Sequence, residues 1–157
     1  MLKVTEKGFT LIEVLVALTI AGAIMGVVTM TIMTMMQVGP KNNAQAIVFT
    51  QVQNAGLFIS RDAMMTEAVV TDQPGTLVVL NWTDAQDVTH SIKYIFQGTT
   101  LMRQVDSGAM TLVAEYIDMA SSTATWDSGR KKLTVTIKAS FGGAQAQRTY
   151  EVTPRPT

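Results

Sequence analysis

The sequence predicts an α+β fold, in which a long N-terminal helix precedes an antiparallel β-sheet, and two observations lead to this prediction. Apolar residues recur at spacings of three and four in the first part of the chain, and the period changes to two after the segment DQPG at 72–75. Hydrophobic residues make up 47% of the chain and charged residues 15%, whereas soluble domains usually carry about 25% charged residues. The apolar excess lies near the N-terminus, so we expect the helix to have a membrane part and a water-soluble part.

The first apolar stretch is long enough to cross a membrane. Residues 14–36, VLVALTIAGAIMGVVTMTIMTMM, include no charged residue, and as a helix they would reach roughly 35 Å. The stretch is too long for the apolar region of a secretory signal and is not followed by an A-x-A cleavage pattern. Lys3 and Lys7 precede it, so the short leader is expected in the cytoplasm and the C-terminal domain on the other side.

Glu13 is the feature that a simple membrane anchor does not explain. A carboxylate in a membrane segment costs several kcal/mol near the centre and less toward the end, and such a residue usually has a functional partner. The apolar helix offers no basic residue, so we expect the partner to come from another chain. Gly8 followed by Phe9 provides a small residue at which a peptidase could cut, and the amine released at Phe9 would lie about one helical turn from Glu13.

The segment KGFTLIEVLVALTI at 7–20 resembles the class III signal of type IV prepilins and type II secretion pseudopilins. In that signal a short charged leader ends in glycine, and a phenylalanine, a glutamate four residues later and a long apolar helix follow. The resemblance implies cleavage between Gly8 and Phe9 by a membrane prepilin peptidase and N-methylation of Phe9. It also implies a helical filament in which Glu13 faces the amino terminus of a neighbouring subunit, where the pair would neutralise two charges and fix the axial register.

The resemblance also gives an expected organisation and location. We expect a leader peptide at 1–8, a transmembrane and assembly helix at 9–38, and an extracytoplasmic pilin-like globular domain at 41–157. The protein would be a single-pass protein of the inner membrane that is assembled into a pilus or pseudopilus. Its expected partners are other pilin or pseudopilin subunits, the prepilin peptidase, the inner-membrane assembly platform and membrane lipid.

Two glycines and a proline are expected to shape the long helix. Gly22 and Gly26 form a G-x-x-x-G pattern, which allows close helix contact, although simple tolerance in an alanine-rich helix explains it equally well. Pro40 follows Gly39 and removes a backbone donor, so we expect a kink or a short break there.

The helix is expected to resume at about Ala44 and to continue to about Ala68 with one apolar stripe. The stripe comprises Val48, Val52, Ala55, Ile59 and Ala63, widened by Ile47 and Phe58.

Period-two patterns then predict an antiparallel sheet of four to six strands, packed on this amphipathic helix. The expected strands lie at 76–82, 88–96, after Gly98 to residue 105, 111–120, 131–141 and 146–153.

The sequence predicts no enzyme and no cofactor. Cysteine is absent, which removes disulfides and thiolate sites, and the formal net charge is zero. No run of basic residues with interleaved aromatic residues indicates direct binding to nucleic acid. His90 shares a strand face with Ile92 and Tyr94, and we expect a partly buried, hydrogen-bonded histidine rather than a catalytic base.

Three aspartates and one asparagine lie in other short motifs. Asp84, Asp87 and Asp127 could bind calcium, but they do not have EF-hand spacing and are expected to cap turns, so no metal site is predicted. Asn81 begins a glycosylation sequon, whose use would depend on the host.

Three functions remain, and the first is expected. It is a minor pseudopilin of a type II secretion system that helps to initiate or tip the pseudopilus, because the strand pattern resembles that of the larger J- or W-like minor pseudopilins. The second is a minor type IV pilin for adhesion, motility or DNA uptake, and the absence of a cysteine-closed loop argues against the large adhesive pilins. The third is a membrane-anchored binding domain that does not polymerise.

Overall fold

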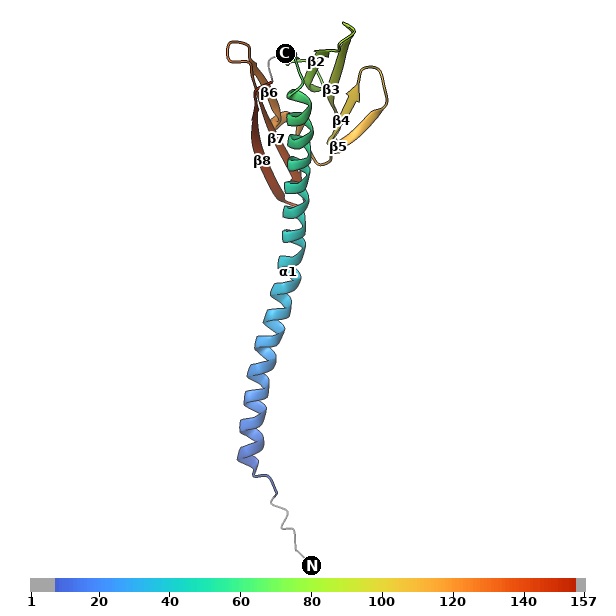
Figure 1. Ribbon diagram of the computed structural model, residues 1–157. Helices are drawn as coiled ribbons and strands as arrows, with labels where there is room; N and C mark the ends of the chain where they lie inside the picture. The colour runs from blue at the N-terminus through green and yellow to red at the C-terminus, as the bar shows by residue number, and fades with distance from the viewer. Residues whose placement is uncertain (1–7, 155–157) are drawn as a thin grey trace, which may run out of the picture. The chain divides into compact units, whose positions relative to one another are not determined.

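The computed structural model describes residues 8–154 and divides the chain into two compact units, Met1–Pro40 and Lys41–Thr157. The described residues form one long α-helix, α1 (Leu11–Ala63), eight β-strands and one short 3-10 helix (Figure 1). Of the expected leader at 1–8, only Gly8 lies among the described residues.

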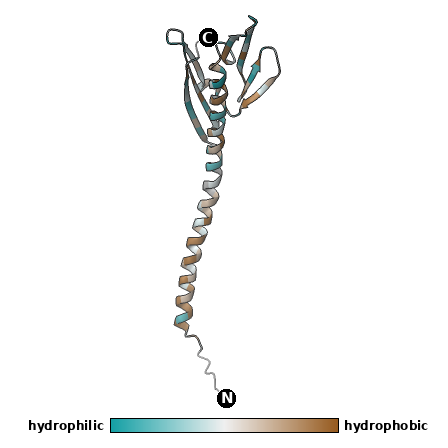
Figure 2. Ribbon diagram, in the orientation of Figure 1, coloured by the Kyte–Doolittle hydropathy of each residue, from teal (hydrophilic) through white to brown (hydrophobic). Residues whose placement is uncertain are grey.

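The part of α1 in the first unit carries apolar side chains that the chain itself does not cover. Every side chain from Gly8 to Met36 is exposed, and Figure 2 shows this part of the helix mostly in the colour of hydrophobic residues. A window of 18 residues in α1 has a mean hydropathy of 2.4, so the helix is long and apolar enough to cross a membrane.

The backbone of α1 is helical through Gly39 and Pro40. The short break expected there is therefore absent. A proline within a helix removes one i→i−4 hydrogen bond, which a long helix tolerates when the flanking turns remain intact. The kink stays a prediction.

The part of α1 in the second unit buries one stripe of side chains, as the sequence predicted. The buried residues are separated by three or four positions, the spacing of one helix face. They are Ala44, Val48, Val52, Ala55, Ile59 and Ala63. Of the two residues expected to widen the stripe, Ile47 is half-buried and Phe58 remains 42% exposed.

Five of the strands form one antiparallel sheet in which each strand pairs with the next in sequence. These strands are β1 (Ala68–Val70), β2 (Thr76–Thr83), β3 (Thr89–Gln97), β4 (Thr100–Val105) and β5 (Met110–Ala114). The register places Leu80 opposite Ile92 and Tyr94 opposite Arg103. The face that carries Leu80, Ile92 and Tyr94 is buried in the core.

The chain leaves this sheet after β5 and enters a second sheet. Tyr116 has a left-handed backbone with φ of 60°, and Ile117 then forms a bridge with Ala139. A short 3-10 helix, η1 (Met119–Ser121), follows and is capped by the Asp118 side chain.

The second sheet is a three-stranded meander. It contains β6 (Thr123–Asp127), β7 (Lys132–Phe141) and β8 (Ala144–Val152). On β7, Leu133, Val135, Ile137 and Ala139 are buried, which confirms the alternation expected for this strand.

The strand arrangement differs from the expected single sheet. Eight strands in two sheets replace four to six strands in one sheet among the described residues. The expected strand at 111–120 ends at Ala114, because the left-handed turn at Tyr116 redirects the chain. Residues 68–70, where the helix was expected to end, form the short strand β1 instead.

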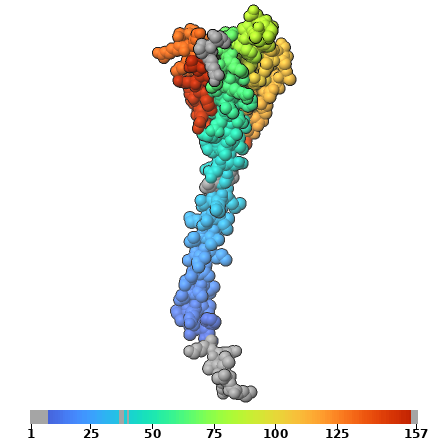
Figure 3. Space-filling model, in the orientation of Figure 1, coloured from blue at the N-terminus to red at the C-terminus, as the bar shows by residue number. Residues whose placement is uncertain are grey.

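The stripe of α1 in the second unit contacts both sheets. In Figure 3 the corresponding segment of α1, in green, lies between the strands of the five-stranded sheet and those of the three-stranded sheet. Asp62 binds Arg103 of β4 through two hydrogen bonds of 2.6 and 3.2 Å and accepts a third of 2.6 Å from Tyr94 of β3. On the other side, the Tyr150 hydroxyl of β8 donates to the carbonyl of Val52 at 3.0 Å.

Candidate functional site at the start of α1

The predicted processing site lies in exposed, non-helical backbone. Gly8, Phe9 and Thr10 precede the first helical residue, Leu11, and all of them are exposed, Phe9 by 87%. A peptidase must bind its substrate in an extended form, and an exposed segment outside a helix meets this need without unfolding.

Glu13 lies in the first turn of α1 and forms a capping box with Thr10. The Thr10 backbone N–H and its hydroxyl each donate to Oε2 of Glu13, both at 2.9 Å. The Glu13 N–H in turn lies 3.4 Å from the Thr10 hydroxyl oxygen, a long contact. Thr10 is thus the N-cap residue and Glu13 the third helical residue, which satisfies backbone donors that the first turn leaves without a partner.

This arrangement gives Glu13 a local role that the sequence analysis did not identify. The signal was present, since T-x-x-E before an apolar run is typical of a helix start, and here it reads Thr10-Leu-Ile-Glu13. The isolated charge of Glu13 in an apolar segment had favoured a basic partner instead. The carboxylate also lies at the positive end of the helix dipole, which favours its negative charge.

The capping box uses only part of the hydrogen-bonding capacity of Glu13. Both donors from Thr10 bind the same oxygen, Oε2, and among the described residues nothing donates to Oε1. A carboxylate accepts about four hydrogen bonds. Glu13 can therefore keep its cap and still bind a cation or a further donor from outside the chain.

Further along the same helix, Gly22 and Gly26 have open surroundings. A Cβ atom built on either glycine meets no atom within 4 Å once the helix's own backbone is set aside. Packing within this chain does not require a small residue at either position. Any role of their small size therefore lies in contacts made from outside the chain.

The polar residues singled out in the second unit have structural roles in turns. Asp84 accepts the backbone N–H groups of Gln86 and Val88, and Asp127 accepts those of Gly129 and Arg130. The expectation that they cap turns is confirmed for both. Among the described residues, no group of three or more acidic, histidine or cysteine residues is arranged to hold a metal ion.

His90 is hydrogen-bonded and about 30% exposed, as expected for a structural histidine. Each ring nitrogen lies beside an aspartate carboxylate, that of Asp84 or that of Asp106.

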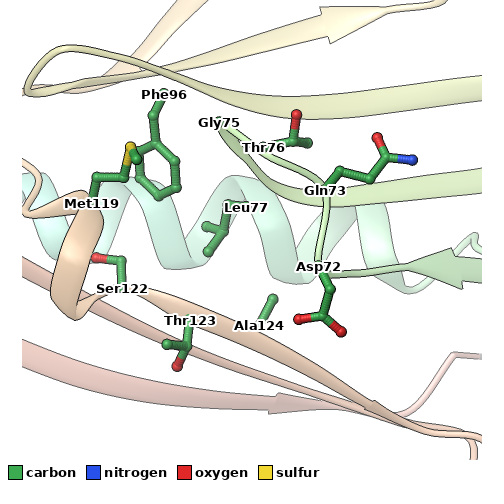
Figure 4. Close-up of a pocket in the computed structure, with 10 residues that line it drawn as sticks. All are labelled: Asp72, Gln73, Gly75, Thr76, Leu77, Phe96, Met119, Ser122, Thr123 and Ala124. Carbon is green, nitrogen blue, oxygen red and sulfur yellow. The ribbon is translucent and has the colours of Figure 1, made fainter.

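A cavity of about 220 Å³ lies between the start of β2 and the start of β6 (Figure 4). Leu77, Phe96 and Met119 provide apolar walls, and Asp72 and Gln73 lie at one end. Its one serine, Ser122, accepts the Lys138 backbone N–H at 3.1 Å and so serves the strand pairing. The lining offers no paired nucleophile and base.

Comparison with protein families matches residues 4–29 to the family described as the prokaryotic N-terminal methylation motif. The matched residues contain Gly8, Phe9 and the Thr10–Glu13 capping box. No curated protein matches the chain, and neither does any solved structure. This prepilin-type motif, followed by the exposed apolar helix, indicates a structural subunit like those of type IV pili and pseudopili, and the motif implies interaction with other pilin subunits and with a prepilin peptidase.

Proposed function

We propose that the protein is a minor pseudopilin of a type II secretion system, processed between Gly8 and Phe9 and incorporated into a filament through α1. The observation that carries this proposal is the first part of α1, where the methylation motif precedes a helix whose apolar side chains are all exposed from Leu11 to Met36. An exposed apolar surface of this length is suited to burial against lipid and then against the helices of other subunits.

In this proposal residues 1–8 are a cytoplasmic leader, residues 9–38 span the inner membrane and residues 41–157 form an extracytoplasmic domain. After cleavage the new Phe9 amine is methylated. It then lies next to Thr10, whose N–H already binds Glu13 of the same chain. Because Oε1 of Glu13 has no donor within the described residues, the amine of a neighbouring subunit can bind it without disrupting the cap.

Processing is tested by the intact mass and N-terminal sequence of the membrane-extracted protein from a host that has the peptidase. We expect a chain that begins at methylated Phe9. Gly8→Val should accumulate as uncleaved precursor, because the branched side chain obstructs the scissile bond, while Gly8→Ala is the matched control and should be cleaved. A wild-type chain that still begins at Met1 would show that the site is wrongly placed.

The role of Glu13 in assembly can be separated from its role in the cap by two substitutions. Glu13→Gln removes the charge but leaves an oxygen that accepts the Thr10 N–H, as glutamine does in other capping boxes. Thr10→Val removes the hydroxyl from the cap but leaves the charge of Glu13. The cap itself is worth about 1 kcal/mol.

We expect Glu13→Gln to be cleaved normally and to enter filaments poorly, because it leaves a neighbour's amine without a counter-ion in a sheltered site, a loss that typically costs about 3–5 kcal/mol. Thr10→Val should be cleaved and incorporated nearly as well as wild type. Crosslinking to partner subunits, run beside a cleavage assay, measures both steps. The reverse ranking of the two variants would assign Glu13 to the cap alone.

The secretion role is distinguished from a pilus role by phenotype. A deletion strain should retain exoproteins in the periplasm and keep its surface pili, motility and DNA uptake. The opposite pattern would favour a minor type IV pilin. The absence of cysteine supports the secretion role over the large adhesive pilins with a cysteine-closed loop.

A membrane-anchored binding domain that does not polymerise is the remaining alternative. It predicts a protein that is processed and functional but never crosslinks to other subunits. In our proposal the fragment 41–157 is soluble and monomeric in light scattering, because the assembly contacts lie in the deleted helix. A stable oligomer of that fragment would move the assembly contacts to the globular domain.

A further inference from the structure

His90 lies between two turns at one end of the five-stranded sheet. Its Nε2 lies 3.1 Å from Oδ2 of Asp84, in the turn between β2 and β3, and its Nδ1 lies 3.0 Å from Oδ2 of Asp106, in the turn between β4 and β5. The ring also stacks on Trp82 of β2, with centroids 5.1 Å apart and planes 23° from parallel. One imidazole therefore joins two turns that are not adjacent in sequence.

Each aspartate also accepts backbone N–H groups with its second oxygen, Asp84 from its own turn and Asp106 from strand β3. Oδ1 of Asp84 accepts the N–H groups of Gln86 and Val88, both at 2.9 Å. Oδ1 of Asp106 accepts the Ser91 N–H at 2.7 Å, and the Asp106 N–H donates to the Ser91 carbonyl, also at 2.7 Å. Asp106 has a left-handed backbone with φ of 50°, a conformation that aspartate adopts more readily than most non-glycine residues.

The chemistry of the ring decides which protonation state this arrangement fits. A neutral imidazole has one N–H donor and one lone pair, so one of its nitrogens would turn a lone pair toward a carboxylate oxygen. An imidazolium donates from both nitrogens and satisfies both carboxylates. The Trp82 face beside it also attracts a cation more than a neutral ring.

We propose that His90, Asp84 and Asp106 form a pH-dependent tie, closed when the imidazole is protonated, that holds the β2–β3 and β4–β5 turns together.

The surrounding charges support this assignment. Hydrogen bonds from His90 to Asp106 and then to Asp84 raise the pKa of the imidazole above its ordinary value of 6.5, against a smaller opposing effect of partial burial. The pKa of the Asp84 carboxyl is lowered first by the Val88 N–H and then by His90, and that of Asp106 first by His90 and then by the Ser91 N–H. The other charged groups on the neighbouring elements are Arg61, Asp62, Glu67, Asp87, Lys93 and Arg103. Among the described contacts none of these touches the imidazole, and Asp62 is paired with Arg103.

The direction of the pH effect follows from the raised pKa. A group with a higher pKa in the folded state than in the unfolded state contributes stability that is fully present below the unfolded value, near 6.5, and is lost as the pH rises through the folded value. The two turns should therefore be tied at pH values below the raised pKa of His90 and released above it.

The first test is an NMR titration of the full-length protein in detergent micelles. His90 is the only histidine in the sequence, so its ring signals need no assignment by mutation. We expect a titration midpoint above 6.5, with both ring nitrogens protonated below it. A midpoint at or below 6.5 would overturn the proposal, because it would show that the two carboxylates do not stabilise the protonated imidazole.

The second test replaces one carboxylate by an amide of the same shape. Asp84→Asn keeps an oxygen for the Gln86 and Val88 N–H groups and presents an N–H to Nε2, so a neutral ring that donates from Nδ1 to Asp106 becomes fully satisfied. We expect the titration midpoint to fall relative to wild type. When the pH is raised from 6 to 9, we expect the midpoint temperature of unfolding to fall in both proteins, and to fall less in Asp84→Asn than in wild type.

Asp127→Asn is the matched control, because Asp127 caps a turn through Oδ1 in the same way and does not contact His90. It should leave the titration of His90 unchanged. Near-UV circular dichroism follows unfolding of the second unit, since both tryptophans and all three tyrosines lie within Lys41–Thr157. Equal pH dependence in wild type and Asp84→Asn would show that the imidazole does not tie the turns.

Discussion

From Leu11 to Met36 every side chain of α1 is exposed, whereas from Ala44 to Ala63 the same helix buries one stripe completely. Both segments are helical and both contain isoleucine, glycine and one carboxylate that forms hydrogen bonds. They differ in where their partners come from. The second segment finds its partners in the strands of its own chain, while the first can bury its apolar surface only against lipid or other molecules. Three pairs of matched substitutions test this difference.

The two carboxylates should give the largest contrast. Asp62→Ala leaves Arg103 and Tyr94 without their shared acceptor and should lower the free energy of unfolding of the second unit by about 3–5 kcal/mol. Glu13→Ala should leave that free energy unchanged, because among the described residues Glu13 forms hydrogen bonds with Thr10 alone, outside the second unit.

Urea denaturation of the full chain in detergent, followed by near-UV circular dichroism, measures both variants. Asp62→Asn is the control that keeps an acceptor and should lose less stability than Asp62→Ala. An Asp62→Ala protein as stable as wild type would mean that water replaces the carboxylate at no cost.

Two isoleucines, Ile59 and Ile24, should give the next largest contrast in the stability of the second unit. Ile59 is 1% exposed, so Ile59→Ala creates a cavity in the core and should destabilise the second unit by about 2–4 kcal/mol. Ile24 is 59% exposed, and Ile24→Ala should not change that stability. The same denaturation experiment compares them, and the pair is matched because each substitution removes the same atoms from the same type of helix. Equal losses would show that the two segments fold as one cooperative unit.

The two glycines should show the smallest contrast in stability. A Cβ at Gly56 would overlap the Tyr150 ring, so Gly56→Ala should destabilise the second unit by about 1–3 kcal/mol in spite of the better helix propensity of alanine. At Gly22 an added Cβ meets nothing, and Gly22→Ala should leave stability unchanged. If Gly22→Ala nevertheless reduces crosslinking to partner subunits, the small face of the first segment is an assembly contact.

The features that the sequence predicted well are those with a regular period. Burial on one side imposes a repeat of 3.6 residues on a helix and of two on a strand, so the stripe from Val48 to Ala63 and the alternation on β7 could be recognised without coordinates. The T-x-x-E signal of the cap at Thr10 was equally available. The cap was not predicted, because a charge beside an apolar segment favours an ionic partner over a backbone one.

The features that could not be predicted depend on which distant segments meet. Asp62 and Arg103 are 41 residues apart, and no local pattern indicates that they pair. The division into two sheets depends on the left-handed backbone at Tyr116, a residue type that gives no turn signal of the kind that glycine or asparagine gives. The strand β6 follows that turn, and its segment TATWD is short and half polar.

The contact of Tyr150 with Val52 and Gly56 delays the folding of the domain until β8 has emerged. The hydrogen bond joins Tyr150 to a residue 98 positions earlier, and β8, which carries Tyr150, is the last of the described strands. During synthesis the helical stripe therefore emerges long before the strand that covers one side of it. Closing so long a loop is slow, and an exposed apolar stripe is prone to aggregation in the meantime. We expect the domain to complete its fold only after β8 has been synthesised.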